Sequence, residues 1–313
     1  MDRGKQDELV GMLLKLRRDG TAVDGSGAAG SGTVVLGLST KYGVAYHDFA
    51  GLRSYERKWL CCLAVAKSMR KAALAGRSAA RIHGMWVIGD QTGAAERVEL
   101  VLGAGRVPSK SQWPKGCTYL EQRGRKPTIV EHATVRVTDP LSTAFDIALH
   151  HGFREGLVAM DWILHHHTTR EVVEAELERF GPTRNIDTLR KVVQHAIPNS
   201  MSPYESYARA LLIDANMDGW VANAKVGEFF IDLLRRRLGI EIDGGVKYDG
   251  ETYKPLDETL LAERNREKKI QNKGIILYRV SPEVLLRREE EFLAEVERLQ
   301  VIADAMGPLP PDI

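Results

Sequence analysis

Apolar residues recur along much of the first part of the chain at the three- and four-residue spacing of amphipathic helices. This spacing predicts helices at residues 7–18, 54–75, 141–150, 154–166, 168–180 and 185–195, with a further helix beginning at Ser78. Alternating and β-branched runs predict strands at 97–103, 117–123 and 129–139. Thr168 and Glu171 have the spacing of a capping box at the start of helix 168–180. This part of the chain is therefore expected to be an α/β region.

A glycine-rich segment, DGSGAAGSG at 24–32, separates the first predicted helix from the rest. It contains the pattern GxGxxG (Gly25, Gly27 and Gly30), which forms dinucleotide-binding loops only where a strand precedes it and a helix follows. The residues that follow, TVVLGL, have the composition of a strand. We therefore interpret the segment as a flexible linker.

The pattern changes after the polar, proline-containing segment 197–203. Helices are predicted at 203–215, 257–273 and 282–306, and strands at 229–234, 238–243 and 274–280. This order predicts a compact unit with a central mixed sheet flanked by helices. The expected organisation is a short segment over 1–53, an α/β domain over 54–198 and a further domain over 199–313.

Composition limits the possible functions only weakly. The 313 residues carry a net charge of +2, so any nucleic-acid partner must be recognised by local basic clusters. The three cysteines are odd in number and lack the spacing of metal ligands, which favours a reducing, cytoplasmic location. The charged N-terminus does not resemble a signal peptide, and no stretch has the length and apolarity of a membrane span. No membrane association is expected.

Acidic residues in two neighbouring strands are the strongest chemical signal. Asp232 lies in FFIDLL, Glu241 and Asp243 lie in GIEIDG, and the segment RRRLG between them is placed to turn the chain. A hairpin brings Asp232 level with Glu241, and Glu205 begins a helix capped by Ser202. Such carboxylates suit Mg²⁺ or Mn²⁺, with Asp232, Glu241 and Glu205 as the expected ligands. Asp243 has the alternative role of capping the turn that follows it.

Basic residues surround these acids in the sequence. They are Arg235, Arg236, Arg237, Arg266, Lys273 and Arg279. One interpretation is a solvated surface. The other, which their position favours, is a set of phosphate contacts beside the carboxylates.

The second part resembles the very-short-patch-repair-like branch of the PD-(D/E)XK nucleases. The resemblance rests on Ser-Pro-x-Glu at 202–205, Asp232, Glu-x-Asp-Gly at 241–244, and the segment ERNREKKIQNKGIILYRV at 263–280. In that segment Glu263 and Arg266 match the family's helix pair, Gly274 its glycine and Arg279 its strand arginine. The resemblance implies a restriction-endonuclease-like fold and magnesium-dependent cleavage of DNA.

The chain departs from that family at one catalytic position. The Glu-x-Lys of the nucleases reads Glu241-Ile242-Asp243, and a lysine occupies position 247, where the family usually has histidine. A lysine that activates water must then come from elsewhere, and Lys247 and Lys269 are the two candidates.

The first part resembles the AbiEi-type antitoxin region that is often fused to such nucleases. The matching stretches are LAGRSAARIHGMW, VELVLGAGRV and VRVTDPLSTAFDIALHHG. A winged helix usually precedes this region, whereas here KYGVAYHDF at 41–49 resembles only its last strand. Taken together, we expect a DNA endonuclease-like protein of phage defence or exclusion. The alternatives are a non-catalytic, antitoxin-like DNA-binding regulator and a phage-exclusion protein that binds a toxin or a phage protein.

Overall fold

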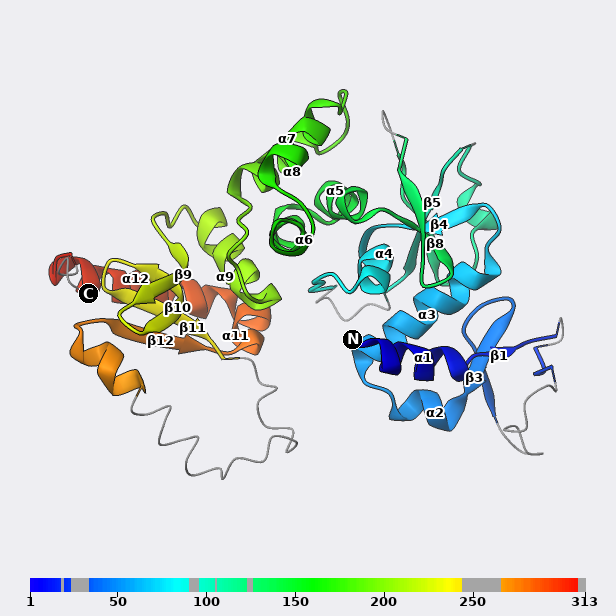
Figure 1. The fold of residues 1–313 in the computed structure, drawn as a ribbon, viewed down its shortest axis with the longest axis horizontal. Coiled ribbons are helices and arrows are strands. Elements are labelled where there is room, and N and C mark those ends of the chain that lie inside the picture. The colour runs from blue at the N-terminus through cyan, green and yellow to red at the C-terminus, as the bar shows by residue number, and fades with distance from the viewer. Residues whose placement is uncertain are drawn as a thin grey trace. The chain divides into compact units, whose positions relative to one another are not determined.

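The computed structural model describes residues 1–17, 20–23, 34–89, 96–104, 106–122, 126–243 and 266–308. The chain forms two compact units, Met1–His195 and Ala196–Ile313, and residues 1–53 belong to the first of them. Both units combine helices with sheets, so the expected α/β fold class is confirmed (Figure 1). Within the described ranges, no helix combines the length and apolarity needed to cross a membrane.

The first unit begins with a small three-stranded sheet. Helix α1 (Arg3–Gly11) precedes it, the strand order is β1-β3-β2, and helix α2 (Tyr46–Gly51) follows. The strands are β1 (Leu14–Lys15), β2 (Val35–Gly37) and β3 (Tyr42–Ala45). The helix expected at 7–18 was wrong in its second half, because Leu14 and Lys15 pair with β3. Glycine, a weak helix former, ends α1 at Gly11.

A five-stranded sheet of order β6-β5-β4-β8-β7 forms the centre of the first unit. Its strands are β4 (Ala72–Leu74), β5 (Val98–Leu102), β6 (Cys117–Tyr119), β7 (Ile129–His132) and β8 (Val135–Thr138). A short 3-10 turn, η1 (Lys110–Gln112), lies between β5 and β6. Helices α3 (Ser54–Ser68) and α4 (Gly76–His83) flank β4 in sequence. Leu60 and Leu63 of α3 share one buried core with Leu74, Leu100 and Val137 of the sheet.

Two predictions for this sheet were wrong in detail. Helix α3 ends at Ser68, and the last residues of the helix expected at 54–75 form the buried central strand β4 instead. The single strand expected at 129–139 is a hairpin, because Ala133 and Thr134 turn the chain with positive φ angles of 49° and 64°.

Four helices complete the first unit: α5 (Pro140–His151), α6 (Phe153–His166), α7 (Arg170–Glu178) and α8 (Ile186–His195). Their positions confirm the helical periodicity to within a few residues. The expected cap was wrong by one residue: Thr169, not Thr168, is the N-cap of α7, and its side chain bonds to Glu171.

The second unit is built on a four-stranded mixed sheet of order β12-β11-β10-β9. Its strands are β9 (Val221–Val226), β10 (Phe229–Arg235), β11 (Leu238–Ile242) and β12 (Ile276–Val280). β12 runs parallel to β11, while β10 is antiparallel to both of its neighbours. The helices are α9 (Pro203–Asp214), α11 (Pro282–Arg287) and α12 (Glu289–Ala305), and residues 266–272 are also helical. The edge strand β9 was not predicted, and the helix expected at 282–306 is interrupted at Arg288.

Helices lie on both faces of this sheet. Tyr278 of β12 stacks on Phe292 of α12, with ring centroids 6.2 Å apart. The preceding residue, Leu277, packs instead with the cluster that contains Ile270 and Ile231. Successive strand residues point to opposite faces, so α12 and the helical residues 266–272 cover opposite sides.

Candidate functional site

The candidate site lies where strands β10 and β11 stop pairing. Their paired residues run from Arg235 and Leu238, beside the turn, to Leu233 and Ile240. Beyond this pair, the Ile242 N–H donates to Asp232 Oδ2 at 2.7 Å instead of to a backbone carbonyl. The Asp232 carboxylate therefore replaces a backbone acceptor at the end of this pairing.

Glu241 is the buried acid of the site and is 5% exposed. Two arginines bind its carboxylate. Arg266 Nη2 lies 2.5 Å from Oε1 and Nη1 lies 3.1 Å from Oε2, while Arg279 Nη2 lies 3.2 Å from Oε2. Arg279 is paired with Glu241 across the parallel β11–β12 ladder, so the strand register itself brings this ion pair together. Burying a carboxylate requires such partners, because an unpaired buried charge is strongly destabilising.

Asp232 and Asp243 add negative charge beside Glu241. Burial raises the pKa of Asp232, the Ile242 N–H opposes this rise, and the charge of Glu241 adds to it. Asp243 contributes a smaller increase and Arg266 a decrease. The Asp243 carboxylate is more than half exposed and lies 3.8 Å from Arg279 Nη1, while its backbone N–H bonds to the Val280 carbonyl. The nearby Arg266 therefore does not cancel the effect of burial and of the neighbouring acids on the pKa of Asp232.

Glu205 has a local role at the start of α9. The Glu205 N–H donates to Ser202 Oγ, the expected cap, at 3.2 Å, and Glu205 Oε2 accepts the Met201 N–H at 2.9 Å. The first contact is the predicted N-cap, and the second joins the Glu205 side chain to the residue before the cap. Neither contact joins Glu205 to Asp232 or Glu241, and metal binding by Glu205 stays a prediction.

The three consecutive arginines of the β10–β11 turn contact residues 304–308 and Gly274. Arg235 and Arg236 pair with Asp304 of α12, at 3.0 Å and 3.5 Å. Arg237 donates to the carbonyls of Gly274, Gly307 and Pro308. Their recorded contacts are thus intramolecular, and phosphate binding by these three residues stays a prediction.

Of the two candidate lysines, Lys269 lies within the described residues and Lys247 does not. Lys269 Nζ pairs with Glu228, at the turn between β9 and β10, at a distance of 3.0 Å, and both side chains are well exposed. Lys269 therefore lies beside that turn and, within the described part of the chain, its ammonium contacts none of the three acids. Lys247 and Glu263 lie outside the described residues, and so does Gly244. Lys273 lies close to Gly227 of the same β9–β10 turn.

Two backbone groups that take part in the site could not be predicted from the sequence. The Ile242 N–H binds Asp232, and the Phe230 carbonyl accepts a hydrogen bond from Arg266 Nη2 at 3.0 Å. Arg266 therefore bridges β10 and β11 at the point where they separate. Any residue type supplies these backbone groups, so only the three-dimensional register identifies them.

The acids of the site match the ligand type of a hard divalent cation. No group of three or more His, Cys, Asp or Glu side chains in the described ranges has the arrangement of a complete metal cage. Mg²⁺ does not need one, because it commonly uses one or two carboxylates and completes its shell with water and phosphate oxygens. Asp232 and Glu241 are two such carboxylates. A cation bound beside Asp232 would lower the pKa of this acid, which burial raises in the structure. The two carboxylates are of the ligand type that Mg²⁺ or Mn²⁺ takes, and binding of either ion at them stays a prediction.

Comparison of the chain with protein-family models, with curated proteins and with solved structures gives no match.

Proposed function

We propose that the second unit is a Mg²⁺- or Mn²⁺-dependent endonuclease that hydrolyses phosphodiester bonds of DNA. The observation that supports this most directly is the meeting of Asp232, Glu241 and Asp243 at the end of the β10–β11 pairing, between Arg266 and Arg279. Carboxylates that hold a cation, next to guanidinium groups that attract phosphate, are the components that phosphodiester hydrolysis requires.

Each residue has a distinct role in this proposal. Asp232 and Glu241 would hold the ion, with Asp243 as a further oxygen beside them. Arg279 and Arg266 orient the Glu241 carboxylate and keep positive charge where the DNA phosphate approaches. A bound Mg²⁺ would lower the pKa of a coordinated water and neutralise charge developing on the phosphate.

Lys247 and Lys269 remain the two candidates for the group that polarises the attacking water. Lys269 would first have to leave its ion pair with Glu228. An exposed pair of this kind stabilises the protein by about 0–1 kcal/mol, so its loss is a small obstacle. Glu205 would act indirectly, by fixing the first turn of α9.

A second candidate function is favoured by the arginines themselves. Arg266 and Arg279 already bind both oxygens of Glu241, so the acid is neutralised without a metal ion. On this reading the unit is a nuclease-like scaffold in a DNA-binding, antitoxin-like regulator, or in an exclusion protein that binds a toxin or phage protein.

Cleavage assays separate the two functions. Wild type, Glu241→Gln and the control Glu283→Gln, which changes an exposed acid of α11, are incubated with plasmid and oligonucleotide DNA in Mg²⁺, Mn²⁺ or EDTA. A nuclease should cut only with the divalent ion, lose cleavage in Glu241→Gln and retain it in Glu283→Gln. Lys247→Met and Lys269→Met then identify the lysine, whose loss should slow cleavage by about 10²–10⁴. DNA binding without cleavage in any ion, unchanged by Glu241→Gln, would favour the scaffold.

A further inference from the structure

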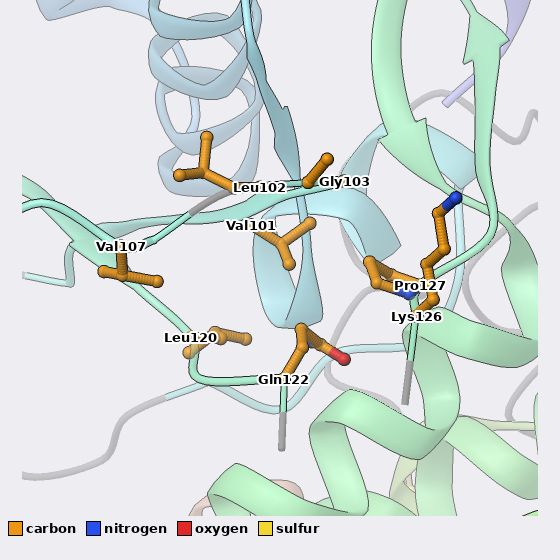
Figure 2. Close-up of a pocket in the computed structure, with 9 residues that line it drawn as sticks. Val101, Leu102, Gly103, Val107, Leu120, Gln122, Lys126 and Pro127 are labelled. Carbon is orange, nitrogen blue, oxygen red and sulfur yellow. The ribbon is translucent and has the colours of Figure 1, made fainter. Parts of the chain in front are cut away.

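A cavity of about 360 Å³ opens on the side of the five-stranded sheet that faces away from α3 (Figure 2). Leu100 belongs to the core that contains Leu60 and Leu63 of α3. The next residue of β5, Val101, belongs to a separate small cluster with Leu120. Because neighbouring strand residues point to opposite faces, Val101 faces the cavity and not α3.

The cavity has an aliphatic interior and two polar residues at one side. Val101, Val107 and Leu120 supply the aliphatic lining, and Figure 2 labels them with Gln122 and Lys126, whereas the side chain of the lining residue Leu102 packs against the core shared with α3. Val101 and Leu120 are 1% and 7% exposed, so they are fixed by packing. The partly exposed Val107 adds aliphatic surface that a hydrocarbon group can remove from water, along with the surface of the ligand itself.

The polar residues differ in how they are held. Gln122 Nε2 donates to Oδ1 of the buried Asp146 at 2.9 Å, which fixes the amide in place. Lys126 is exposed, and its ammonium has no hydrogen-bond or ion-pair partner in the part of the chain that the structure describes. The cavity therefore offers an anion a cation that no neighbouring carboxylate of this part neutralises.

Lys126 also lines a second cavity of about 560 Å³, whose lining is more polar. That cavity is lined by Arg179, Glu176 and Asp139 and by the packed rings of Phe145 and Phe180. Its charges of both signs make it a poorer match for a simple anion with a hydrocarbon chain. The two cavities can be distinguished because Val107 lines only the first and Arg179 only the second.

We propose that the first cavity is a binding site for a short-chain aliphatic carboxylate. The hydrocarbon chain packs against Val101, Val107 and Leu120, and the carboxylate pairs with Lys126. This site belongs to the first unit and does not depend on the endonuclease proposal. It gives that unit a small-molecule ligand in addition to any macromolecular partner.

The test is calorimetric titration of the full-length protein with butanoate, hexanoate, octanoate and decanoate. Affinity should rise about fourfold for each added methylene until the cavity is full. 1-Octanol, which has the octanoate chain without its charge, should bind at least about tenfold more weakly. Affinity that does not depend on chain length, equal binding of octanol and octanoate, or no heat from any acid at millimolar concentration would overturn the proposal.

Three variants locate the site. Lys126→Met should weaken octanoate binding about two- to fivefold, the scale of an exposed ion pair, whereas Lys115→Met, which changes an exposed lysine between η1 and β6, should leave it unchanged. Val107→Phe should also weaken binding by filling the cavity, and the melting temperature shows that the variant is folded. If Val107→Phe binds like wild type while Lys126→Met does not, the acid occupies the second cavity and the proposed site is wrong.

Discussion

Arg266 binds Glu241 through two hydrogen bonds and so connects the helical residues 266–272 to strand β11. The same guanidinium donates to the Phe230 carbonyl of β10. One side chain thus holds three elements together at the point where the candidate carboxylates meet. Arg279 supports Glu241 from the neighbouring strand, so removal of either arginine leaves the acid with a single cationic partner.

Arg266→Ala should lower the free energy of unfolding by about 1–3 kcal/mol, since it leaves a buried carboxylate with fewer partners and an unpaired carbonyl on β10. Arg266→Lys should recover only part of this loss, because an ammonium cannot reproduce the forked contact. Urea unfolding measures both changes. Arg287→Ala, at an exposed position of α11, is the control and should stay within about 0.5 kcal/mol of wild type. Equal losses in Arg266→Ala and Arg287→Ala would show that the bridge contributes nothing.

The sequence predicts the regular elements of the second unit better than it predicts its contacts. The Ser202 cap, the helix that it starts and strands β10 and β11 follow from local patterns, because each is encoded within a few residues. Strand β4 could not be predicted in the same way. Its residues, Ala72–Leu74, are good helix formers, and only pairing with β5 and β8, far along the chain, makes them a strand.

The same holds for the site: contacts between neighbouring strands could be predicted, and contacts between distant segments could not. Alternation in β11 and the short turn after β10 indicate that Asp232 and Glu241 approach each other. The pairing of Arg266 with Glu241 spans 25 residues, and the contacts of Arg237 with the carbonyls of Gly307 and Pro308 span 70 and 71. No local pattern distinguishes arginines with intramolecular contacts from phosphate-binding ones, so the sequence left a solvated surface and phosphate contacts as alternatives and only favoured the second.

Asp232→Asn should stabilise the protein at neutral pH. The pKa of Asp232 is raised in the folded state, so folding favours its protonated form and opposes its ionised form. The cost of ionisation is absent below the ordinary pKa of about 4 and develops as pH rises through the raised pKa. The gain from asparagine, which can still accept the Ile242 N–H, should therefore be present at pH 7 and vanish toward pH 4. Unfolding measured across this range tests it, with Asp218→Asn, an exposed acid of the same unit, as the control.

A divalent cation should raise the melting temperature of wild type, because it binds the folded pair of acids and relieves their repulsion. A concentration ten times the dissociation constant adds about 1.4 kcal/mol of stability. Melting curves with and without millimolar Mn²⁺ should differ for wild type and for Asp218→Asn, and coincide for Asp232→Asn and Glu241→Gln. A midpoint shift of the same size in all four proteins would mean that the ion binds elsewhere.

Gly76→Ala should be strongly destabilising, for a reason that lies outside helix propensity. Gly76 opens α4 with φ of +49°, and an added Cβ would fall inside contact distance of Glu99 Oε2. The Glu99 carboxylate has little room to move, since it is 4% exposed, accepts the Arg77 N–H at 2.6 Å and pairs with His151 Nε2 at 2.7 Å. We expect a loss of about 2–4 kcal/mol in urea unfolding, the sum of backbone strain and a displaced buried carboxylate.

Gly84→Ala is the matched control: φ is +71° and nothing lies near the new Cβ, so only the strain of about 1 kcal/mol should remain. The double variant Gly76→Ala/Glu99→Ala then isolates the steric part, because the added Cβ should cost no more in the Glu99→Ala background than it does at Gly84. If Gly76→Ala costs the same with and without the Glu99 side chain, the damage comes from the backbone alone and the carboxylate is not what requires glycine there.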